Sequence, residues 1–519
     1  MTQLRWPRIA TGFLWCQAAL AAVLAVLMAS GKLSRVEVVC PGSMPFSWPC
    51  LRVDALSLPM FLMVSFLGAV VATYSVSYLK GDGRQGRFFR YLVVTTTAVS
   101  WFVLAPNLWL AFLAWLVTSW GLHRLLLHFP TRPGAVLAAR KKFVVSRIGD
   151  VAILTAILLV QERFGTTDYG RLFKSVGEAS WPTLAGAADI QWIGILFAIG
   201  AMTKSAQFPF HFWLPETMET PTSVSALMHA GIINAGGYFI IRLSPLLVHI
   251  DTARLMLVLA GALTAVFAAL VMITQNDIKK KLAYSTISQM GLMMFECGVG
   301  AYVVALLHIF LHSGYKAHAF LSTGGLIDAA QGPKRGSSQL SGLATTFALV
   351  ATGGVMMVAV VWSNRGLFPL LLCLGVTLLG LCQVILTDAK VAGRGRMVWL
   401  WTVPVTLATG AIYLFLEQVT GSAVQGVVAP MTALPSQVVA ATSGVLAYLI
   451  FGAGFLAAQA VVAADSPRRQ KLYLFCLNGG RWGSKTTAWL TRFWPVQRRV
   501  FAAPGADIKA KQLAGEHYA

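Results

Sequence analysis

The chain has 519 residues, of which 57% are hydrophobic and only 12% are charged, and its mean hydropathy of +0.69 excludes an ordinary soluble domain. Long apolar segments recur along almost the whole length, so we predict an all-α polytopic membrane protein. The net charge of +22 could suggest nucleic-acid binding, but the positive residues lie in short loops between apolar runs, and the positive-inside rule explains this pattern without nucleic acid.

We predict about fourteen transmembrane helices. They lie near residues 9–30, 55–78, 91–105, 108–128, 143–161, 190–208, 222–246, 254–274, 282–299, 302–327, 341–362, 366–387, 397–417 and 436–463. The first run is long and lacks a convincing small-residue cleavage site, which favours a retained helix over a signal peptide.

Lys and Arg gather in alternate loops between these segments. One such loop contains Arg132, Arg140, Lys141 and Lys142. The positive-inside rule then places these loops and both termini in the cytoplasm, which requires an even number of helices. We therefore expect a multi-pass membrane protein with both termini in the cytoplasm.

An apolar run that begins at Ile190 ends in a lysine, Lys204, and Pro209 follows it. A charge near the bilayer centre costs roughly 2.5–3.5 kcal/mol on insertion scales, so an ionisable residue at membrane depth is a functional-site hypothesis by default. The proline indicates a broken helix, which is tolerated where protein or a water-filled cavity satisfies the freed backbone groups. Because His229 lies inside the next apolar run, the two residues predict part of a proton or ion path.

A second group of titratable residues lies in the predicted helix 302–327. His308, His312 and Lys316 are spaced i, i+4, i+8, which places them on one stripe of the helix, about 6 Å apart. Histidine titrates near neutrality and a buried lysine can release its proton, so this stripe favours a proton relay over simple hydrogen bonding to neighbouring helices. Metal binding is disfavoured because no carboxylate accompanies the two histidines on that face.

Three acidic residues are candidate accessories to this path. Asp150 follows Arg147 at the start of the predicted helix 143–161, where an ion pair or a helix cap explains it as well as a pathway role does. Glu216 and Glu219 lie in the loop after the break, where they either gather protons or are simply solvated.

The segment 465–519 is basic, and its tryptophans alternate with Arg and Lys. This pattern is typical of an amphipathic segment on an anionic membrane surface, and a docking surface for a soluble partner is the alternative. The sequence contains no Walker loop, no dinucleotide-binding glycine fingerprint, no HExxH and no GxSxG. We therefore predict a transporter subunit without a cofactor of its own rather than an enzyme.

The segment KSAQFPFHFWLPETMETPTSVSALMHAG resembles the signature of the proton-translocating, antiporter-like subunits of respiratory complex I and Mrp antiporters. The segments VDALSLPMF, KKFVVSRIGD, QNDIKKKLAYSTISQMG and HIFLHSGYKAHAFLSTGGLI resemble further blocks of that family in the same order, and together they cover roughly residues 50–330. The resemblance implies inverted five-helix repeats, each with a broken helix.

On this resemblance, Lys204 matches the lysine of the first broken helix, and His229 matches the proton-carrying position of the next helix. His308, His312 and Lys316 match the central axis that connects the two repeats. The implied organisation is N-terminal helices, a first repeat, a second repeat, C-terminal helices and a basic tail, in residues 1–90, 91–250, 251–390, 391–464 and 465–519.

The sequence departs from the family pattern at two places. The helix 108–128 lacks the glutamate that the family carries there, and the helix 341–362 lacks the lysine or glutamate of the second broken helix. These losses argue against complete pumping of the complex I type.

The segments AWLVTSWGLHRLL and HAGIINAGGYFIIRLSPLL resemble one branch, the membrane subunits of DAB-type inorganic-carbon accumulation systems. This resemblance implies a large soluble partner on the cytoplasmic side that is similar to β-carbonic anhydrases and holds zinc. The membrane subunit would conduct protons or another cation, and the partner would hydrate CO2 to bicarbonate. A subunit of a redox-driven pump or Na+/H+ antiporter, and a non-conducting membrane anchor, are the two alternatives.

Overall fold

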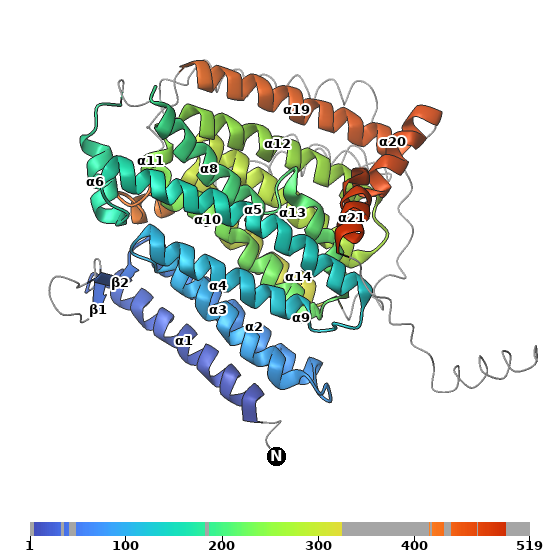
Figure 1. The fold of residues 1–519 in the computed structure, drawn as a ribbon, viewed down its shortest axis with the longest axis horizontal. Coiled ribbons are helices and arrows are strands. Elements are labelled where there is room, and N and C mark those ends of the chain that lie inside the picture. The colour runs from blue at the N-terminus through green and yellow to red at the C-terminus, as the bar shows by residue number, and fades with distance from the viewer. Residues whose placement is uncertain are drawn as a thin grey trace, which may run out of the picture.

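The computed structural model shows long helices that run roughly parallel to one another (Figure 1). A β-hairpin and helix α6 (Tyr169–Glu178) lie at one end of the bundle, and helices α20 (Pro467–Leu477) and α21 (Trp482–Phe493) lie at the other end (Figure 1). The structure describes residues 5–32, 36–40, 48–181, 186–323, 415, 418–429, 437–463 and 466–494.

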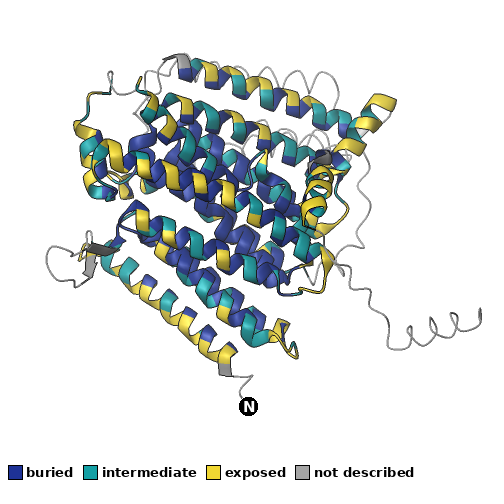
Figure 2. Cartoon of the chain, viewed as in Figure 1, coloured by how far each residue is buried: buried dark blue, intermediate teal, exposed yellow. Residues whose placement is uncertain are grey.

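The N-terminal part contributes four helices that pack as neighbours. They are α1 (Arg5–Ala29), α2 (Ser57–Tyr78), α3 (Gln85–Val103) and α4 (Leu108–Leu126). Strand β1 (Val36–Cys40) pairs antiparallel with β2 (Trp48–Val53), and this hairpin connects α1 to α2. Helix α1 lies at the edge of the bundle and leaves much of its apolar surface exposed (Figure 2), as expected of a helix that faces lipid.

The centre of the bundle consists of a long helix followed by several short, interrupted ones. These elements are α5 (Pro133–Phe164), α8 (Ala188–Lys204), η2 (Phe210–Glu219), α9 (Thr222–Ala230), η3 (Ile232–Asn234), α10 (Ala235–Arg242) and α11 (Ser244–Leu247). The segment from α9 through α10 is buried along its whole length, so it forms the inner layer that the other helices surround (Figure 2).

The remaining described elements are α12 (Asp251–Thr274), α13 (Ile278–Val299), α14 (Tyr302–Leu321), α19 (Gln437–Ala463) and η5 (Gly479–Arg481). Helices α12 and α13 approach each other closely at Gly261 and Gly291. A Cβ added at either glycine would lie 2.5 Å from a backbone nitrogen of the opposite helix. This close packing joins α12 to α13, and α14 packs directly against both α13 and α9 of the inner layer.

Six described helices are long and apolar enough to cross a membrane, judged by length and composition. They span Trp6–Ala29, Ser57–Tyr78, Pro133–Phe164, Thr222–Arg242, Asp251–Thr274 and Val439–Val462. The predicted segments 341–362, 366–387 and 397–417 lie outside the described residues, apart from residue 415. The other predicted segments are present mainly as helices, although several begin or end elsewhere than predicted.

Two differences from the predicted helices bear on the candidate site. Helix α5 begins ten residues before the predicted residue 143, and Pro133 occupies its first turn, where a missing N–H carries no cost. The predicted helix 222–246 is not continuous, because α9 ends at Ala230 and the chain passes through η3 before α10 begins. The side chain of Asn234 donates a hydrogen bond of 2.8 Å to the carbonyl of Ala230, a group that the interruption releases.

A buried ion pair joins the start of α2 to the inner layer. Both Nη atoms of Arg242 donate to the carboxylate of Asp54, at 2.7 and 3.1 Å, and the two side chains are 1% and 3% exposed. The Asp54 carboxylate also accepts from the Nε of Arg52 at 2.9 Å, and its Oδ1 accepts from the backbone N–H of Ser57. A bidentate pair with further hydrogen bonds is the arrangement in which a buried ion pair is sustained.

Asp54→Asn leaves the buried guanidinium of Arg242 without its counter-ion, so we expect a loss of about 3–5 kcal/mol of stability. Thermal unfolding of the detergent-solubilised protein measures it. The matched control is Asp189→Asn, because the Asp189–Arg163 pair is 37% exposed on both sides and should contribute about 0–1 kcal/mol. Equal destabilisation by the two substitutions would contradict the structural role of Asp54.

Candidate proton path

The helix that carries Lys204 breaks where the sequence predicts it. Helix α8 ends at Lys204, and the chain resumes at η2 after Pro209. The backbone N–H of Phe208, inside the break, donates to the hydroxyl of Thr264 on α12 at 2.9 Å. A side chain of a neighbouring helix thus satisfies a peptide group that the break releases, as a buried break requires.

Lys204 is 7% exposed and lies against α4. Its Nζ donates to the hydroxyl of Ser119 at 2.9 Å and lies 3.5 Å from the carbonyl oxygen of Trp115. The same Nζ is 4.3 Å from the centre of a Trp115 ring, a cation–π contact. In the described part of the chain, no carboxylate forms an ion pair with Lys204.

Asp150 forms no hydrogen bond or ion pair with Lys204 itself, but both residues contact Trp115. The indole N–H of Trp115 donates to Oδ1 of Asp150 at 3.0 Å, and Arg147 forms an ion pair with the other carboxylate oxygen at 2.5 Å. Asp150 therefore makes the ion pair that the sequence offered as one alternative, and it also contacts the residue on which Lys204 rests.

Close packing of α5 against α8 sets this geometry. A Cβ added at Gly149 would lie 2.0 Å from the hydroxyl of Thr203, and one added at Gly200 would lie 2.4 Å from Ile153. These glycines therefore allow the two helices to approach, which brings Asp150 and Lys204 to the same part of α4.

The structure adds Lys142, which the sequence prediction assigned to a cytoplasmic loop. Because α5 begins at Pro133, Lys141 and Lys142 belong to the helix and are only 2% and 3% exposed. The Nζ of Lys142 donates to the backbone carbonyl of Ser119 at 2.6 Å. One serine thus accepts hydrogen bonds from two buried lysines, Lys142 and Lys204. The proline at the start of α5 was the sequence signal that would have predicted this.

Lys141 faces away from this group, towards the C-terminal segment. Its Nζ donates to the carboxylate of Glu216, to the carbonyl of Gly483 at 2.9 Å and to the hydroxyl of Thr487 at 2.6 Å. The neighbouring Arg140 donates to the backbone carbonyl of Trp494 at 2.6 Å. These contacts join α5, η2 and α21.

Glu216 also lines a cavity of ≈340 Å3 between η2 and the C-terminal segment. Burial raises the pKa of the Glu216 carboxyl above its ordinary value, and its hydrogen bond with Lys141 opposes this only in part. Glu219 is exposed, and its side chain lies beside Gly134 in the first turn of α5. Of the two, only Glu216 is both partly buried and beside a cavity.

His229, at the end of α9, is fully buried. Its ring stacks on Phe320 of α14 with 4.4 Å between ring centres, and neither ring nitrogen has a hydrogen-bond partner in the structure. Buried polar atoms usually bind protein groups or ordered water, so this ring is a place where a water molecule is expected.

His308 on α14 contacts two residues of α13 that sequence reasoning missed. Its Nδ1 lies 3.0 Å from both carboxylate oxygens of Glu296, and its Nε2 lies 2.8 Å from the side-chain oxygen of Gln289. Both ring nitrogens face oxygen acceptors, which is the arrangement that suits a doubly protonated imidazole. The α14 face itself carries no carboxylate, as the sequence indicates, but the neighbouring helix α13 supplies Glu296 to His308.

His312 and Lys316 continue the stripe into the interior. The rings of His308 and His312 are 6.2 Å apart, and Nε2 of His312 is buried without a partner. The fully buried Lys316 donates to the backbone carbonyl of Leu282 at 3.2 Å. His229, His312 and Lys316 lie close enough for their charges to interact.

The five predicted residues therefore form two groups. One contains Lys204 with Ser119 and Lys142, and the other contains His229 with the α14 stripe. Among the described residues, no hydrogen bond joins Lys204 to His229, so proton transfer between the groups would require bridging water.

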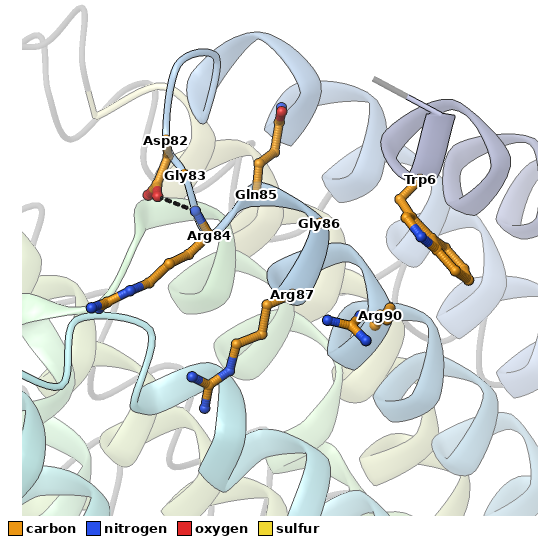
Figure 3. Close-up of a pocket in the computed structure, with 8 residues that line it drawn as sticks. All are labelled: Trp6, Asp82, Gly83, Arg84, Gln85, Gly86, Arg87 and Arg90. Atoms are coloured by element: carbon orange, nitrogen blue, oxygen red, sulfur yellow. Dashed lines mark hydrogen bonds between the residues drawn. The ribbon is translucent and has the colours of Figure 1, made fainter. Parts of the chain in front are cut away.

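Other basic residues lie on the surface, near the loop between α2 and α3. Trp6, Arg84, Arg87 and Arg90 line a hollow of ≈390 Å3 there, and in Figure 3 the Arg84 side chain points away from Trp6. Asp82 accepts from the backbone N–H of Arg84 at 2.8 Å and contacts His128. Burial alone would raise the pKa of Asp82, but these two contacts hold it below its usual value. This cluster is separate from the buried lysines.

A model of the transmembrane family described as NADH:quinone oxidoreductase/Mrp antiporter matches residues 105–391, which is more than half of the chain. The chain belongs to this family. A model of the N-terminus of complex I chain 5 matches residues 41–89. These matches confirm the predicted resemblance to antiporter-like subunits.

Two curated relatives represent two branches of the family. The chain is 44% identical over 278 residues to the probable inorganic carbon transporter subunit DabB2 of Halothiobacillus neapolitanus, an alignment that covers 54% of this chain and 50% of that protein. It is 36% identical over 317 residues to NADH-quinone oxidoreductase subunit L of Mycobacterium tuberculosis, covering 60% and 49%. The chain thus spans about half the length of these relatives.

Among solved structures, the Mrp complex from Dietzia sp. DQ12-45-1b matches with a TM-score of 0.55 and 24% identity, over 98% of this chain and 57% of the matched chain. At that identity, the likeness supports the antiporter-like fold alone. The predicted fold class is therefore confirmed at the level of an antiporter-like helical membrane protein.

Lys141→Ala removes the hydrogen bonds by which α5 holds α21, so we expect the C-terminal segment to detach more often. Limited trypsin digestion should then cleave at Lys485 and Arg492 several-fold faster, as measured by mass spectrometry of the C-terminal fragments. Lys281→Ala, at an exposed position of α13, is the control. Unchanged cleavage in Lys141→Ala would show that these hydrogen bonds do not hold the segment.

Proposed function

We propose that this chain is the membrane subunit of an inorganic-carbon accumulation complex, in which it conducts protons down their gradient. The 44% identity to an inorganic carbon transporter subunit, against 36% to a complex I subunit, supports the branch. The observation that carries the conduction is the buried Lys204 at a helix break, hydrogen-bonded to a hydroxyl rather than to a carboxylate.

The geometry suits conduction because the Lys204 ammonium is not fixed in an ion pair. Its contacts are the Ser119 hydroxyl, the Trp115 carbonyl and the Trp115 ring, and the two hydrogen bonds can persist when the proton leaves because a neutral amine keeps two N–H donors, whereas the cation–π contact is lost. A buried lysine in such surroundings can exchange its proton with water. From there, His229, His312 and Lys316 offer successive titratable groups, and His308 with Glu296 offers a further one on the same helix.

The missing glutamate of α4 fits passive conduction better than pumping. In this proposal Lys142, which donates to the backbone carbonyl of the same Ser119, is a second buried ammonium close enough to Lys204 for their charges to interact. A nearby like charge disfavours the state in which both lysines are protonated. Protons would therefore move one at a time down an existing gradient, without the paired carboxylate that the family uses.

The proposal assigns the carbon chemistry to a partner. We infer a large soluble, zinc-containing subunit similar to carbonic anhydrases on the cytoplasmic side, which hydrates CO2 while this chain supplies the energy. This chain would hold no cofactor and would lie in the bacterial inner membrane with both termini in the cytoplasm. The end of the bundle that carries α20 and α21 would then face the partner.

Lys204→Ala should abolish energy-coupled uptake of inorganic carbon in cells that produce both subunits, because the first buried proton acceptor is lost. Uptake of labelled bicarbonate measures this. Purification in mild detergent should still recover the variant with the soluble partner and its zinc in wild-type amounts.

The control is Lys174→Ala, since the Lys174 side chain is 78% exposed on α6. Normal uptake in Lys204→Ala would contradict the conduction path and favour a membrane anchor. Recovery of flavin or iron–sulfur subunits in place of a zinc protein would contradict the inorganic-carbon assignment and favour a redox-driven pump.

A further inference from the structure

A hollow of ≈310 Å3 lies between α4 and α5, and two residues of the Lys204 group, Ser119 and Lys142, form part of its lining. Its polar lining consists of Ser119, His123, Lys142, Ser146 and Arg147. Lys142 and Arg147 can carry positive charge, and no acidic side chain lines the hollow. The lining is therefore suited to an anion.

Two polar groups of the hollow, Lys142 and His123, lack a full set of partners within the described protein. Lys142 is 3% exposed, and its ammonium, which has three N–H donors, makes one hydrogen bond, to the carbonyl of Ser119. The Nδ1 of His123 is buried without a partner. The nearby carboxylate of Asp150 is already bound by Arg147 and Trp115.

This imbalance is costly at a buried position. A buried ammonium that has lost its hydration needs an opposite charge or a full set of acceptors. Lys204 adds a second positive group on the other side of Ser119. An anion in the hollow would offset both charges, and it would supply acceptors to the unused donors of Lys142.

The rim of the hollow indicates where such an anion comes from. Trp120 and Phe143 line it and are 47% and 39% exposed. The same two helices expose Leu113, Val151 and Leu158, which are apolar residues suited to contact with acyl chains. The hollow also lies near the end of α4, since His123 is in the last turn of that helix, at the level where lipid headgroups meet a transmembrane bundle.

We propose that the hollow between α4 and α5 binds the phosphate of an anionic phospholipid, held by Lys142, His123 and Arg147. The acyl chains lie along the exposed apolar residues of α4 and α5, and the aromatic rings of Trp120 and Phe143 flank the headgroup. Basic pockets between transmembrane helices bind anionic headgroups by this combination of charge and apolar contact. The site places a negative charge beside Ser119, whichever ion the protein carries.

The test is native mass spectrometry of the full-length protein in detergent, titrated with phosphatidylglycerol or phosphatidylcholine. We expect the wild type to retain phosphatidylglycerol in preference to phosphatidylcholine. Lys142→Gln should weaken retention of phosphatidylglycerol about tenfold, the loss expected for one charge-assisted hydrogen bond. The matched control is Lys141→Gln, which removes the same charge from the adjacent position but faces Glu216, and it should retain the lipid.

His123→Phe is the second variant, and it should also weaken retention of phosphatidylglycerol. It keeps the test decisive if Lys142→Gln fails to fold. Retention in Lys142→Gln and His123→Phe equal to that of the wild type overturns the proposal, as does equal binding of phosphatidylcholine. Inorganic phosphate or bicarbonate that displaces the lipid at millimolar concentration would overturn it too, because the site would then belong to a soluble anion.

Discussion

Every ammonium group buried in a membrane protein must find its partners inside the protein, and this constraint shapes the described fold. Lys142, Lys204 and Lys316 are all buried, and each donates to a backbone carbonyl or a hydroxyl. In the part of the chain that the structure describes, none of the three pairs directly with a carboxylate. Their charges are tolerated only where helices break or approach closely enough to present such acceptors.

The contrast with the other buried ions clarifies their roles. Arg242 donates hydrogen bonds to the carboxylate of Asp54. Lys141 donates to the carboxylate of Glu216 and to two further acceptors. Those pairs join elements distant in the chain and suit a structural role. Lys316 lies instead near His229, whose two ring nitrogens are buried without a partner. Proton movement is therefore proposed for the second set and structural cohesion for the first.

The sequence predicted the helical membrane fold, the break after Lys204 and the α14 stripe, because each depends on spacing along one segment. It did not predict the contacts between helices. Glu296 lies on α13 and His308 on α14, and nothing in the sequence marks the two residues as partners. Only the packing of α13 on α14 reveals the pair. Lys142 was misplaced because three consecutive basic residues, 140–142, are typical of a loop, whereas the packing of α5 against its neighbours buries two of them, Lys141 and Lys142. The charge-poor segment 341–362 lies outside the described residues, so its predicted effect on the second repeat stays a prediction.

The proposed function depends on passive proton conduction by this chain, and proton flux through the purified complex measures that property. The complex would be reconstituted into liposomes that contain a pH-sensitive dye, and a pH step with a potassium clamp of the membrane potential would be imposed. If the chain conducts protons, the interior acidifies faster than in protein-free liposomes, without NADH and without sodium. A rate equal to that of protein-free liposomes would contradict conduction, and a rate that requires sodium would identify an antiporter instead.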